Sequence, residues 1–337
     1  AGIARDAALR GFDVALVDKD DLGSGTSSKS SKLVHGGLRY LEHAQFRLVF
    51  EGTSERALLL KRAPHLVRPM PFLVPAYKES RHGRVALDVG LWIYDALSKF
   101  SSPKLHKAYK AGGITKLEPG LRTEALKGGV VYYDCATDDA RLTLENALDA
   151  RSHGAEIVTH ARAGALLRDR DGRIVGAEVT DAEVPESEQP YGKGARTVQV
   201  RALVTVNATG PWSDEVRALL GERPILRPTK GVHLVLDYAR LPTRHAVVML
   251  ARRDHRVMFA IPWGDRTVIG TTDTDYRGDL DHVYADPDDA AYLLETANHY
   301  FPSANLTAND VLATWAGLRP LIAPPTGMSE SDVSREH

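Results

Sequence analysis

The chain has 337 residues, 43% of them hydrophobic, which is enough to bury a sizeable core and to build two domains. Its 43 lysine and arginine residues are balanced by 44 aspartate and glutamate residues, so no long-range attraction to nucleic acid or to an anionic membrane is expected, and any anion must be bound locally. The single cysteine, Cys135, excludes an internal disulfide and a cysteine-based metal site and fits a reducing compartment, and no apolar run approaches the roughly 20 residues that span a bilayer.

The first predicted unit is a helix over residues 1–10 that ends at Gly11, followed by a short apolar strand over residues 12–17 and then Asp18. In dinucleotide-binding folds a glycine-rich turn precedes such a helix, and an acidic residue about 20 positions later accepts hydrogen bonds from the ribose hydroxyls. Asp18 occupies the place of that acid, and we expect the glycine turn to lie upstream of Ala1 in a longer chain. An ordinary helix–strand connection is the alternative.

Residues 26–42, with the sequence TSSKSSKLVHGGLRYLE, are too polar and glycine-rich for a buried core. Hydroxyls and exposed backbone amides suit contacts to phosphate or to the edge of a ring, and Arg39 offers a planar fork that can hold a phosphate through two hydrogen bonds. This pattern predicts a ligand-binding loop, and a solvated loop that caps a helix is the alternative.

A helix is predicted over residues 45–63. Residues 91–94 (LWIY), followed by four lysines within the next 16 residues, fit either an interfacial helix with basic anchors or a core helix followed by solvated lysines.

Strands are predicted over residues 154–158, 175–179 and 202–206, with a tight turn at Asp171-Gly172 before the second of them. The last strand runs to Thr209-Gly210, where small residues would let the backbone approach a bound dinucleotide closely. A buried strand followed by a plain turn is the alternative. Residues 184–194 are expected to form a surface loop.

Four short β-rich runs separated by polar turns predict an antiparallel sheet that floors a substrate cavity. They cover residues 233–236, 246–250, 257–261 and 267–269. The following segment, Thr271-Thr272-Asp273, either shapes the pocket or forms a turn between strands.

Several blocks together resemble the FAD-dependent glycerol-3-phosphate dehydrogenases, the quinone-linked aerobic type, within the amino-acid-oxidase-like flavoproteins. These blocks are residues 1–8, 26–42, 63–66, 133–135, 138–142, 207–212, 230–233, 269–273 and 317–321. The resemblance implies an α/β fold with a split FAD-binding Rossmann-like domain, residues 1–70 and 131–223, and an antiparallel-sheet substrate or cap domain, residues 71–130 and 224–320. Residues 321–337 would begin a further C-terminal region, because the family continues to a Gly-Gly-Lys-x-Thr-Thr segment.

The resemblance also implies roles for single residues. Asp18 would bind the adenosine ribose, and Arg39, Tyr40 and Arg319 would face the substrate. The pyrophosphate and isoalloxazine would be lined by Thr26, Ser27, Lys32, Leu33, His35, Gly36 and Gly37, and the flavin pocket would be closed by Thr209, Gly210 and Trp212.

The implied reaction is the oxidation of glycerol 3-phosphate to dihydroxyacetone phosphate, by hydride transfer to flavin N5 and onward transfer of electrons to a membrane quinone. Arg39 and Arg319 are the candidate phosphate ligands, each worth about 1.5–3 kcal/mol as charge-assisted hydrogen bonds. His233 is the favoured proton acceptor, because histidine titrates near neutral pH; His35, a group outside this chain, or a role for His233 in hydrogen-bonding the flavin only are the alternatives.

Partners and location follow from the same resemblance. We expect a cytoplasmic protein that associates peripherally with the membrane, and a homodimer is a further expectation. Two alternatives for the activity stay open: a glycerol-3-phosphate oxidase that passes electrons to oxygen, and a related FAD-dependent amine or amino-acid oxidase or non-catalytic flavin protein that recognises no phosphate.

Overall fold

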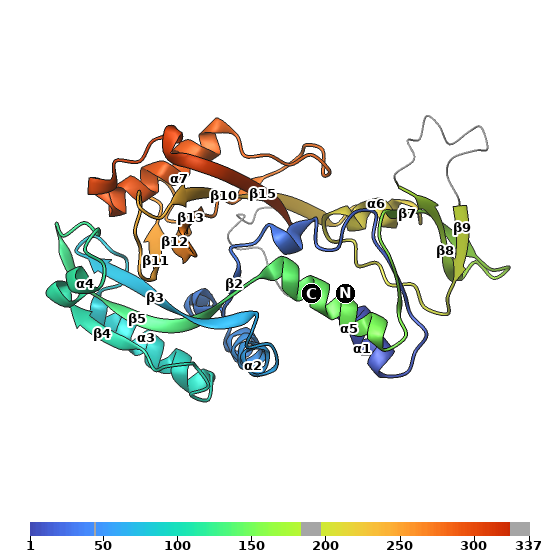
Figure 1. Ribbon diagram of the computed structural model, residues 1–337, viewed down its shortest axis with the longest axis horizontal. Coiled ribbons are helices and arrows are strands. Elements are labelled where there is room, and N and C mark those ends of the chain that lie inside the picture. The colour runs from blue at the N-terminus through green and yellow to red at the C-terminus, as the bar shows by residue number, and fades with distance from the viewer. Residues whose placement is uncertain (44, 183–196, 324–337) are drawn as a thin grey trace.

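The computed structural model describes residues 1–43, 45–182 and 197–323. Its largest element is a ten-stranded sheet with the order β14-β10-β13-β12-β11-β3-β5-β2, in which β15 also pairs with β10 and β4 with β5 (Figure 1). The strands of this sheet are β2 (Leu33–Val34), β3 (Val67–Tyr77), β4 (Lys107–Lys110), β5 (Leu126–Thr137), β10 (Leu226–Asp237), β11 (Ala246–Leu250), β12 (Val257–Trp263), β13 (Arg266–Gly270), β14 (Thr274–Asp275) and β15 (Val311–Ile322).

The four runs predicted as an antiparallel sheet are β10 to β13, and their pairing is antiparallel as expected. The sheet extends further than predicted, because β11 also pairs in parallel with β3. Through this junction the early strands β2, β3 and β5 join the same sheet as the late strands β10 and β15. The proposed domain boundaries stay a prediction.

Helices cover the large sheet in two groups, as Figure 1 shows. The helices α2 (Phe46–Arg62), α3 (Arg84–Leu97) and α4 (Ala111–Leu117) lie near β3 and β5, and α7 (Pro287–Tyr300) lies near β10 and β11. Beneath α2 and α3, Phe72, Leu91 and Tyr94 form part of one apolar core. Beneath α7, Leu293 and Phe301 belong to a second core. The helix predicted over residues 45–63 is confirmed as α2.

A smaller unit at the other end of the molecule contains the first helix, α1 (Gly2–Leu9), packed on α5 (Asp139–Ser152). The buried alanines Ala4, Ala8 and Ala150 allow this close approach. Two short strands, β1 (Ala15–Val17) and β6 (Glu156–Val158), pair in parallel beside them. The predicted order of helix, strand and Asp18 is therefore confirmed, although the strand begins later than expected.

The predicted hairpin is also present. Strands β7 (Ala161–Arg168), β8 (Ile174–Asp181) and β9 (Thr197–Arg201) form a three-stranded antiparallel sheet. The turn between β7 and β8 includes Gly172 at φ +80°, a conformation that glycine adopts without strain. The loop expected over residues 184–194 lies outside the described residues.

The strand predicted over residues 202–206 is wrong. These residues have no strand conformation, and the side chains of Leu203, Val204 and Val206 are largely exposed. Strand propensity measures how well side chains fit a pleated, half-buried surface. In the described part of the chain, no strand pairs with this segment.

The remaining short elements connect these units. They are the 3-10 helices η1 (Thr26–Ser28), η2 (Leu38–His43), η4 (Gly210–Trp212), η5 (Pro302–Ala304) and η6 (Ala308–Asp310), and the helix α6 (Ser213–Ala218). Among the described residues, no helix is both long enough and apolar enough to cross a membrane.

Candidate active site

The serine-rich loop, defined here as residues 26–32, lies across the strand that carries Arg319. The Thr26 hydroxyl donates to the carbonyl of Leu318 at 2.6 Å, although the two residues are 292 positions apart in the sequence. The indole Nε1 of Trp315 donates to the carbonyl of Ser30 at 3.2 Å. A Cβ at Gly317 would lie 2.5 Å from Cβ of Lys29, so glycine permits this contact. The structure thus brings together two segments that the sequence assigned to one site.

His233 lies at the centre of this contact. Its ring, on β10, stacks on Trp315 of β15 with centroids 5.1 Å apart and an interplanar angle of 21°. Its Nε2 lies 2.8 Å from the Ser31 hydroxyl. A Cβ at Gly270 of the neighbouring β13 would overlap the imidazole, so the glycine makes room for the ring. His233 is therefore fixed in one orientation by strands on both sides.

The environment of His233 keeps the ring neutral. Burial, reinforced by the positive charges of Arg319 and Lys32, lowers the pKa of His233 to about 3. The side chain is only 2% exposed, and its Nδ1 has no hydrogen-bond partner among the described residues. Buried polar atoms are rarely left unpaired, so this nitrogen is a candidate ligand contact.

Arg319 is held by the segment after β13. Its Nη1 donates to the carbonyl of Thr272 and to Oδ1 of Asp273, both at 3.2 Å, and its Nη2 donates to the Thr271 hydroxyl at 3.1 Å. A Cβ at Gly231 would lie 2.8 Å from both terminal nitrogens, so the guanidinium rests on glycine backbone. Residues 271–273 connect two strands, and they also orient the predicted substrate-binding arginine.

Lys32 closes the loop on its other side. Its Nζ donates to Oδ1 of Asp139 at 2.7 Å and lies 5.2 Å from the centroid of the Trp315 ring. The Ser30 hydroxyl donates to the second oxygen of Asp139 at 2.7 Å. Asp139 begins α5, so this helix, the loop and β15 are joined through one lysine and one carboxylate.

The predicted residues 33–40 continue from this loop through β2 into η2. Leu33 pairs with Ala136 of β5, and the His35 Nδ1 accepts a hydrogen bond from Gly37 N at 3.1 Å. Gly37 has φ +73°, and a Cβ there would overlap the Tyr40 ring, so the turn requires glycine.

The Arg39 side chain lies outside what the structure describes. Its proposed pairing with Arg319 around a phosphate stays a prediction.

A second group of predicted residues gathers at the end of β1. Burial raises the pKa of the Asp18 carboxyl above its usual value, and Asp20 N donates to its Oδ1 at 3.2 Å. The Nζ of Lys19 lies 4.3 Å from the centroid of the Trp212 ring. A Cβ at Gly25 would lie 3.1 Å from the same ring. Gly25 and Thr26 are consecutive, so the chain runs directly from the Asp18 group to the group around His233 and Arg319.

The other predicted residues of this region are the exposed Thr209 and Ser27 and the half-buried Gly210 and Trp212. The Thr209 hydroxyl donates to Oδ1 of Asn207 at 2.8 Å, and Gly210 has φ +55°. Ser27 is exposed within η1. The indole Nε1 of Trp212 is buried without a partner among the described residues.

The sequence missed three residues of this site: Ser31, Trp315 and Asp139. A signal for Trp315 was present, because side chains alternate along a strand and residues 315, 317 and 319 therefore share one face of β15. Ser31 lies in the predicted ligand-binding loop and Asp139 in a segment of the family resemblance, but only the tertiary fold brings them to His233 and Lys32.

These residues fit an elongated, anionic, aromatic cofactor such as FAD. The Asp18 carboxylate suits ribose hydroxyls. The glycines and hydroxyls of residues 25–37 provide backbone and side-chain donors between the Asp18 group and the group around His233 and Arg319. Among the described residues, the Nε1 of Trp212, in the Asp18 group, and the Nδ1 of His233, in the other group, are buried without a hydrogen-bond partner. The site thus offers polar atoms that a bound flavin nucleotide or its substrate would satisfy.

Comparisons with known proteins point to the same cofactor. A family model described as "FAD dependent oxidoreductase" matches residues 1–332. The chain is 44% identical over 340 residues to a glycerol-3-phosphate dehydrogenase of Mycobacterium leprae, covering 100% of this chain and 55% of that protein. It is 42% identical over 341 residues to an alpha-glycerophosphate oxidase of Streptococcus pyogenes serotype M3, covering 99% of this chain and 54% of that protein. The chain spans about half the length of these curated relatives.

Solved structures agree. A glycerol-3-phosphate dehydrogenase from Bacillus halodurans, complexed with FAD, superimposes with a TM-score of 0.77 at 36% identity, over 96% of this chain and 55% of that one. A glycine oxidase from Geobacillus kaustophilus superimposes with a TM-score of 0.63 at 19% identity, over 95% of this chain and 80% of that one, which shows the fold alone.

Proposed function

Because the chain belongs to the family of FAD-dependent oxidoreductases, we propose that it forms the flavin and substrate sites of an enzyme that oxidises glycerol 3-phosphate to dihydroxyacetone phosphate. The family resemblance and the amino-acid-oxidase-like α/β fold expected from the sequence are both confirmed, and FAD is the cofactor. The observation that carries the proposal is the contact of the serine-rich loop with the strands that hold His233 and Arg319.

Arg319 is the proposed phosphate ligand. It presents a fixed, part-buried guanidinium whose charge, like that of Lys32, is felt at His233, and a charge-assisted hydrogen bond from it to phosphate would contribute about 1.5–3 kcal/mol. The bonds to Thr271 and Asp273 orient the planar group before substrate arrives, which reduces the entropy cost of binding. Arg39 is the proposed second ligand, on the basis of the sequence resemblance.

His233 is the proposed proton acceptor, and Ser31 can accommodate the tautomer that this role needs. When the ring proton is on Nε2 and the Ser31 hydroxyl accepts it, the lone pair of Nδ1 is left to accept the hydroxyl proton of the substrate. A substrate dianion near Arg319 and Lys32 offsets two of the causes that lower the pKa of His233, so the ring becomes a stronger base when substrate is bound. Bound FAD supplies the hydride acceptor for the substrate carbon.

Two electron acceptors are compatible with this reaction, a membrane quinone and oxygen. We favour a membrane quinone, in line with the sequence resemblance, and an oxygen-reducing oxidase is the second candidate because one relative at 42% identity is named as an oxidase. Peroxide yield against quinone reduction, measured on the full-length holoenzyme with glycerol 3-phosphate, separates the two. Turnover of amino acids in place of glycerol 3-phosphate would support the amine-oxidising alternative.

Membrane contact at the cytoplasmic face is proposed for α3. This helix buries Leu91 and Tyr94, whereas Val85, Val89 and Trp92 are more than half exposed. Lysines 99, 104 and 107 follow it, and such an apolar face with basic neighbours suits an interfacial helix. Flotation of the full-length protein with anionic vesicles, compared for wild type and Trp92→Ser, tests the contact.

A homodimer is a further part of the proposal. Sedimentation analysis of the full-length protein without vesicles tests it.

The substrate assignment is tested with Arg319→Ala and Arg319→Lys in the full-length enzyme. We expect Arg319→Ala to raise KM for glycerol 3-phosphate by about 10- to 100-fold, and Arg319→Lys to raise it less, since lysine keeps the charge but loses the fork. Unchanged KM in both variants would contradict the assignment of the phosphate to Arg319.

A further inference from the structure

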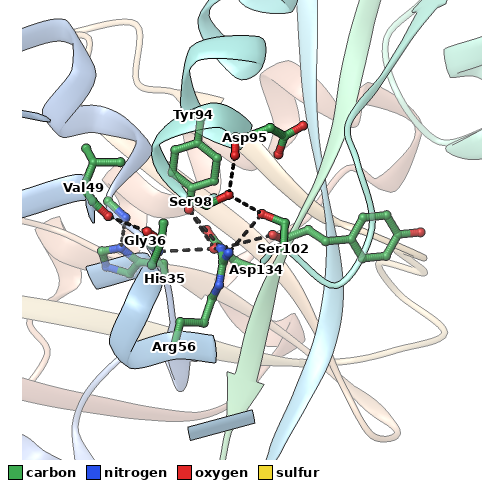
Figure 2. Close-up of polar contacts among 12 residues, drawn as sticks. His35, Gly36, Val49, Arg56, Tyr94, Asp95, Ser98, Ser102 and Asp134 are labelled. Carbon is green, nitrogen blue, oxygen red and sulfur yellow. Dashed lines mark hydrogen bonds and ion pairs between the residues drawn. The ribbon is translucent and has the colours of Figure 1, made fainter. Parts of the chain in front are cut away.

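A buried ion pair lies behind the proposed flavin loop, between α2 and β5. Arg56 and Asp134 have side chains 0% and 1% exposed, and Nη1 of Arg56 donates to Oδ1 of Asp134. The Tyr94 hydroxyl of α3 donates to the same oxygen at 2.9 Å, and Nη2 of Arg56 donates to the Ser102 hydroxyl at 3.0 Å. Figure 2 shows Arg56 of α2 and Tyr94 of α3 pointing toward Asp134 of β5, with Ser102 beside the arginine.

Stability alone does not account for this network. Removing two charges from water costs several kcal/mol each, and replacing a buried ion pair by apolar residues of similar size is often neutral or stabilising. Burial, together with Asp134, raises the pKa of Tyr94 well above its ordinary value, so its hydroxyl stays protonated and remains a donor. The arrangement therefore fixes one carboxylate oxygen in place at an energetic cost.

That oxygen also accepts the backbone N–H of Gly36, at 3.2 Å. A Cβ on Gly36 would overlap both the Tyr94 hydroxyl and a methyl group of Thr53, so the loop backbone is pressed against α2 and α3 (Figure 2). The contact with α2 is also close at Gly52, where a Cβ would lie 3.6 Å from the Gly36 backbone. Gly36 is thus the point at which α2 and α3 contact the loop backbone most closely.

On either side of Gly36 lie residues of the candidate site. His35 precedes it, and its ring accepts from Gly37 N, which fixes the turn toward Tyr40. A displacement of the Gly36 backbone would move both.

We propose that Asp134, Arg56 and Tyr94 are positioning residues that hold Gly36 and so set the geometry of His35 and of the substrate-facing turn after it. The inference rests on the proposed assignment of residues 35–40 to the flavin and substrate site. It adds three residues, from α2, α3 and β5, that act through the loop backbone without touching the substrate.

The first test replaces Tyr94 with phenylalanine in the full-length holoenzyme, with Tyr77→Phe as the matched control. Both tyrosines are buried, and the Tyr77 hydroxyl donates to the carbonyl of Arg122 at 3.0 Å, in the other apolar core. We expect similar shifts of the urea midpoint in both variants. Only Tyr94→Phe should raise KM for glycerol 3-phosphate, by about three- to tenfold, and alter the visible circular dichroism of bound FAD. Unchanged KM and unchanged flavin dichroism in Tyr94→Phe would overturn the proposal.

The second test isolates the hydrogen bond to Gly36 with two neutral double variants. Arg56→Met with Asp134→Asn keeps an acceptor for the Gly36 N–H, whereas Arg56→Met with Asp134→Leu removes it. Both lack the ion pair, and asparagine and leucine have the same number of side-chain heavy atoms with a branch at Cγ; the apolar replacement is expected to remain folded. We expect the leucine variant, which loses the acceptor as well, to raise KM and alter the flavin dichroism clearly more than the asparagine variant. Equal values in the two double variants would overturn the proposal.

Failure of the proposed function is distinguishable from failure of this inference. A full-length wild-type protein that binds FAD but does not oxidise glycerol 3-phosphate removes the proposed substrate, and flavin dichroism still reports whether the network positions the loop. A wild-type enzyme that oxidises glycerol 3-phosphate, with variants that match it in KM and dichroism, removes the positioning role alone.

Discussion

Replacing His233 with glutamine is expected to change how the free energy of unfolding depends on pH. In the folded protein, burial and the charges of Arg319 and Lys32 lower the pKa of His233 to about 3, whereas an unfolded histidine titrates near 6.5. Between these values the unfolded state binds a proton that the folded state does not, so wild-type stability falls as the pH drops below about 6.5. Above about pH 6.5 the folded protein has the full stability that the neutral His233 allows.

The size of the effect follows from the pKa difference. Each pH unit within this window corresponds to about 1.36 kcal/mol, so lowering the pH from 6.5 to 4.5 should cost the wild type about 2–3 kcal/mol through His233. Glutamine does not titrate and retains a polar group toward Ser31. The difference in unfolding free energy between wild type and His233→Gln should therefore shrink by that amount over this range, because all other titrating groups are shared.

Urea unfolding of the FAD-saturated proteins at a series of pH values from 7.5 to 4.5 measures this difference. His65→Gln, at an exposed position, controls for the loss of an imidazole as such. Parallel curves for wild type and His233→Gln across the whole range would refute the argument that His233 is buried as a neutral ring between Trp315 and Ser31.

Three further predictions follow from single contacts. Gly317→Ala places a Cβ 2.5 Å from Cβ of Lys29, so we expect it to displace the serine-rich loop and weaken FAD binding by at least about tenfold in a fluorescence titration, whereas Gly112→Ala, with no neighbour within 4 Å, should leave it unchanged. Gly231→Ala should disturb the Arg319 guanidinium and raise KM for glycerol 3-phosphate more than it lowers kcat; the reverse pattern would argue against the contact. Burial raises the pKa of Cys135 to about 11, so a thiol reagent at pH 8 should label the unfolded protein and spare the native one, and rapid native labelling would contradict this.

The parts of the fold with strong local patterns were predictable. The runs that form β10 to β13 are apolar, rich in β-branched residues and separated by polar turns, and each of them pairs with a neighbouring strand. Residues 202–206 have the same apolar character, yet they form no strand, because propensity specifies no partner. The sequence therefore predicts which segments suit a sheet and leaves open which of them find one.

In the candidate site, too, the local patterns were predictable and the long-range contacts were not. The polarity of the serine-rich loop and the presence of His233 and Arg319 were evident from the sequence. Their contact depends on the register between β10 and β15 and on a loop hydrogen bond between residues 292 positions apart. Arg56 and Asp134 gave no signal, because an arginine within a polar helix normally faces solvent and its buried partner lies 78 positions away. Long-range contacts of this kind are set by the tertiary fold and cannot be read from local periodicity.

The central claim is that a flavin and a phosphorylated alcohol meet where the serine-rich loop contacts the strands of His233 and Arg319. The most direct test mixes the full-length, FAD-loaded protein with glycerol 3-phosphate in the absence of oxygen and any other acceptor. We predict that one equivalent bleaches the visible absorbance of the flavin and appears as dihydroxyacetone phosphate, whereas glycerol at the same concentration leaves the spectrum unchanged. A flavin that stays oxidised in the presence of excess glycerol 3-phosphate would contradict the account.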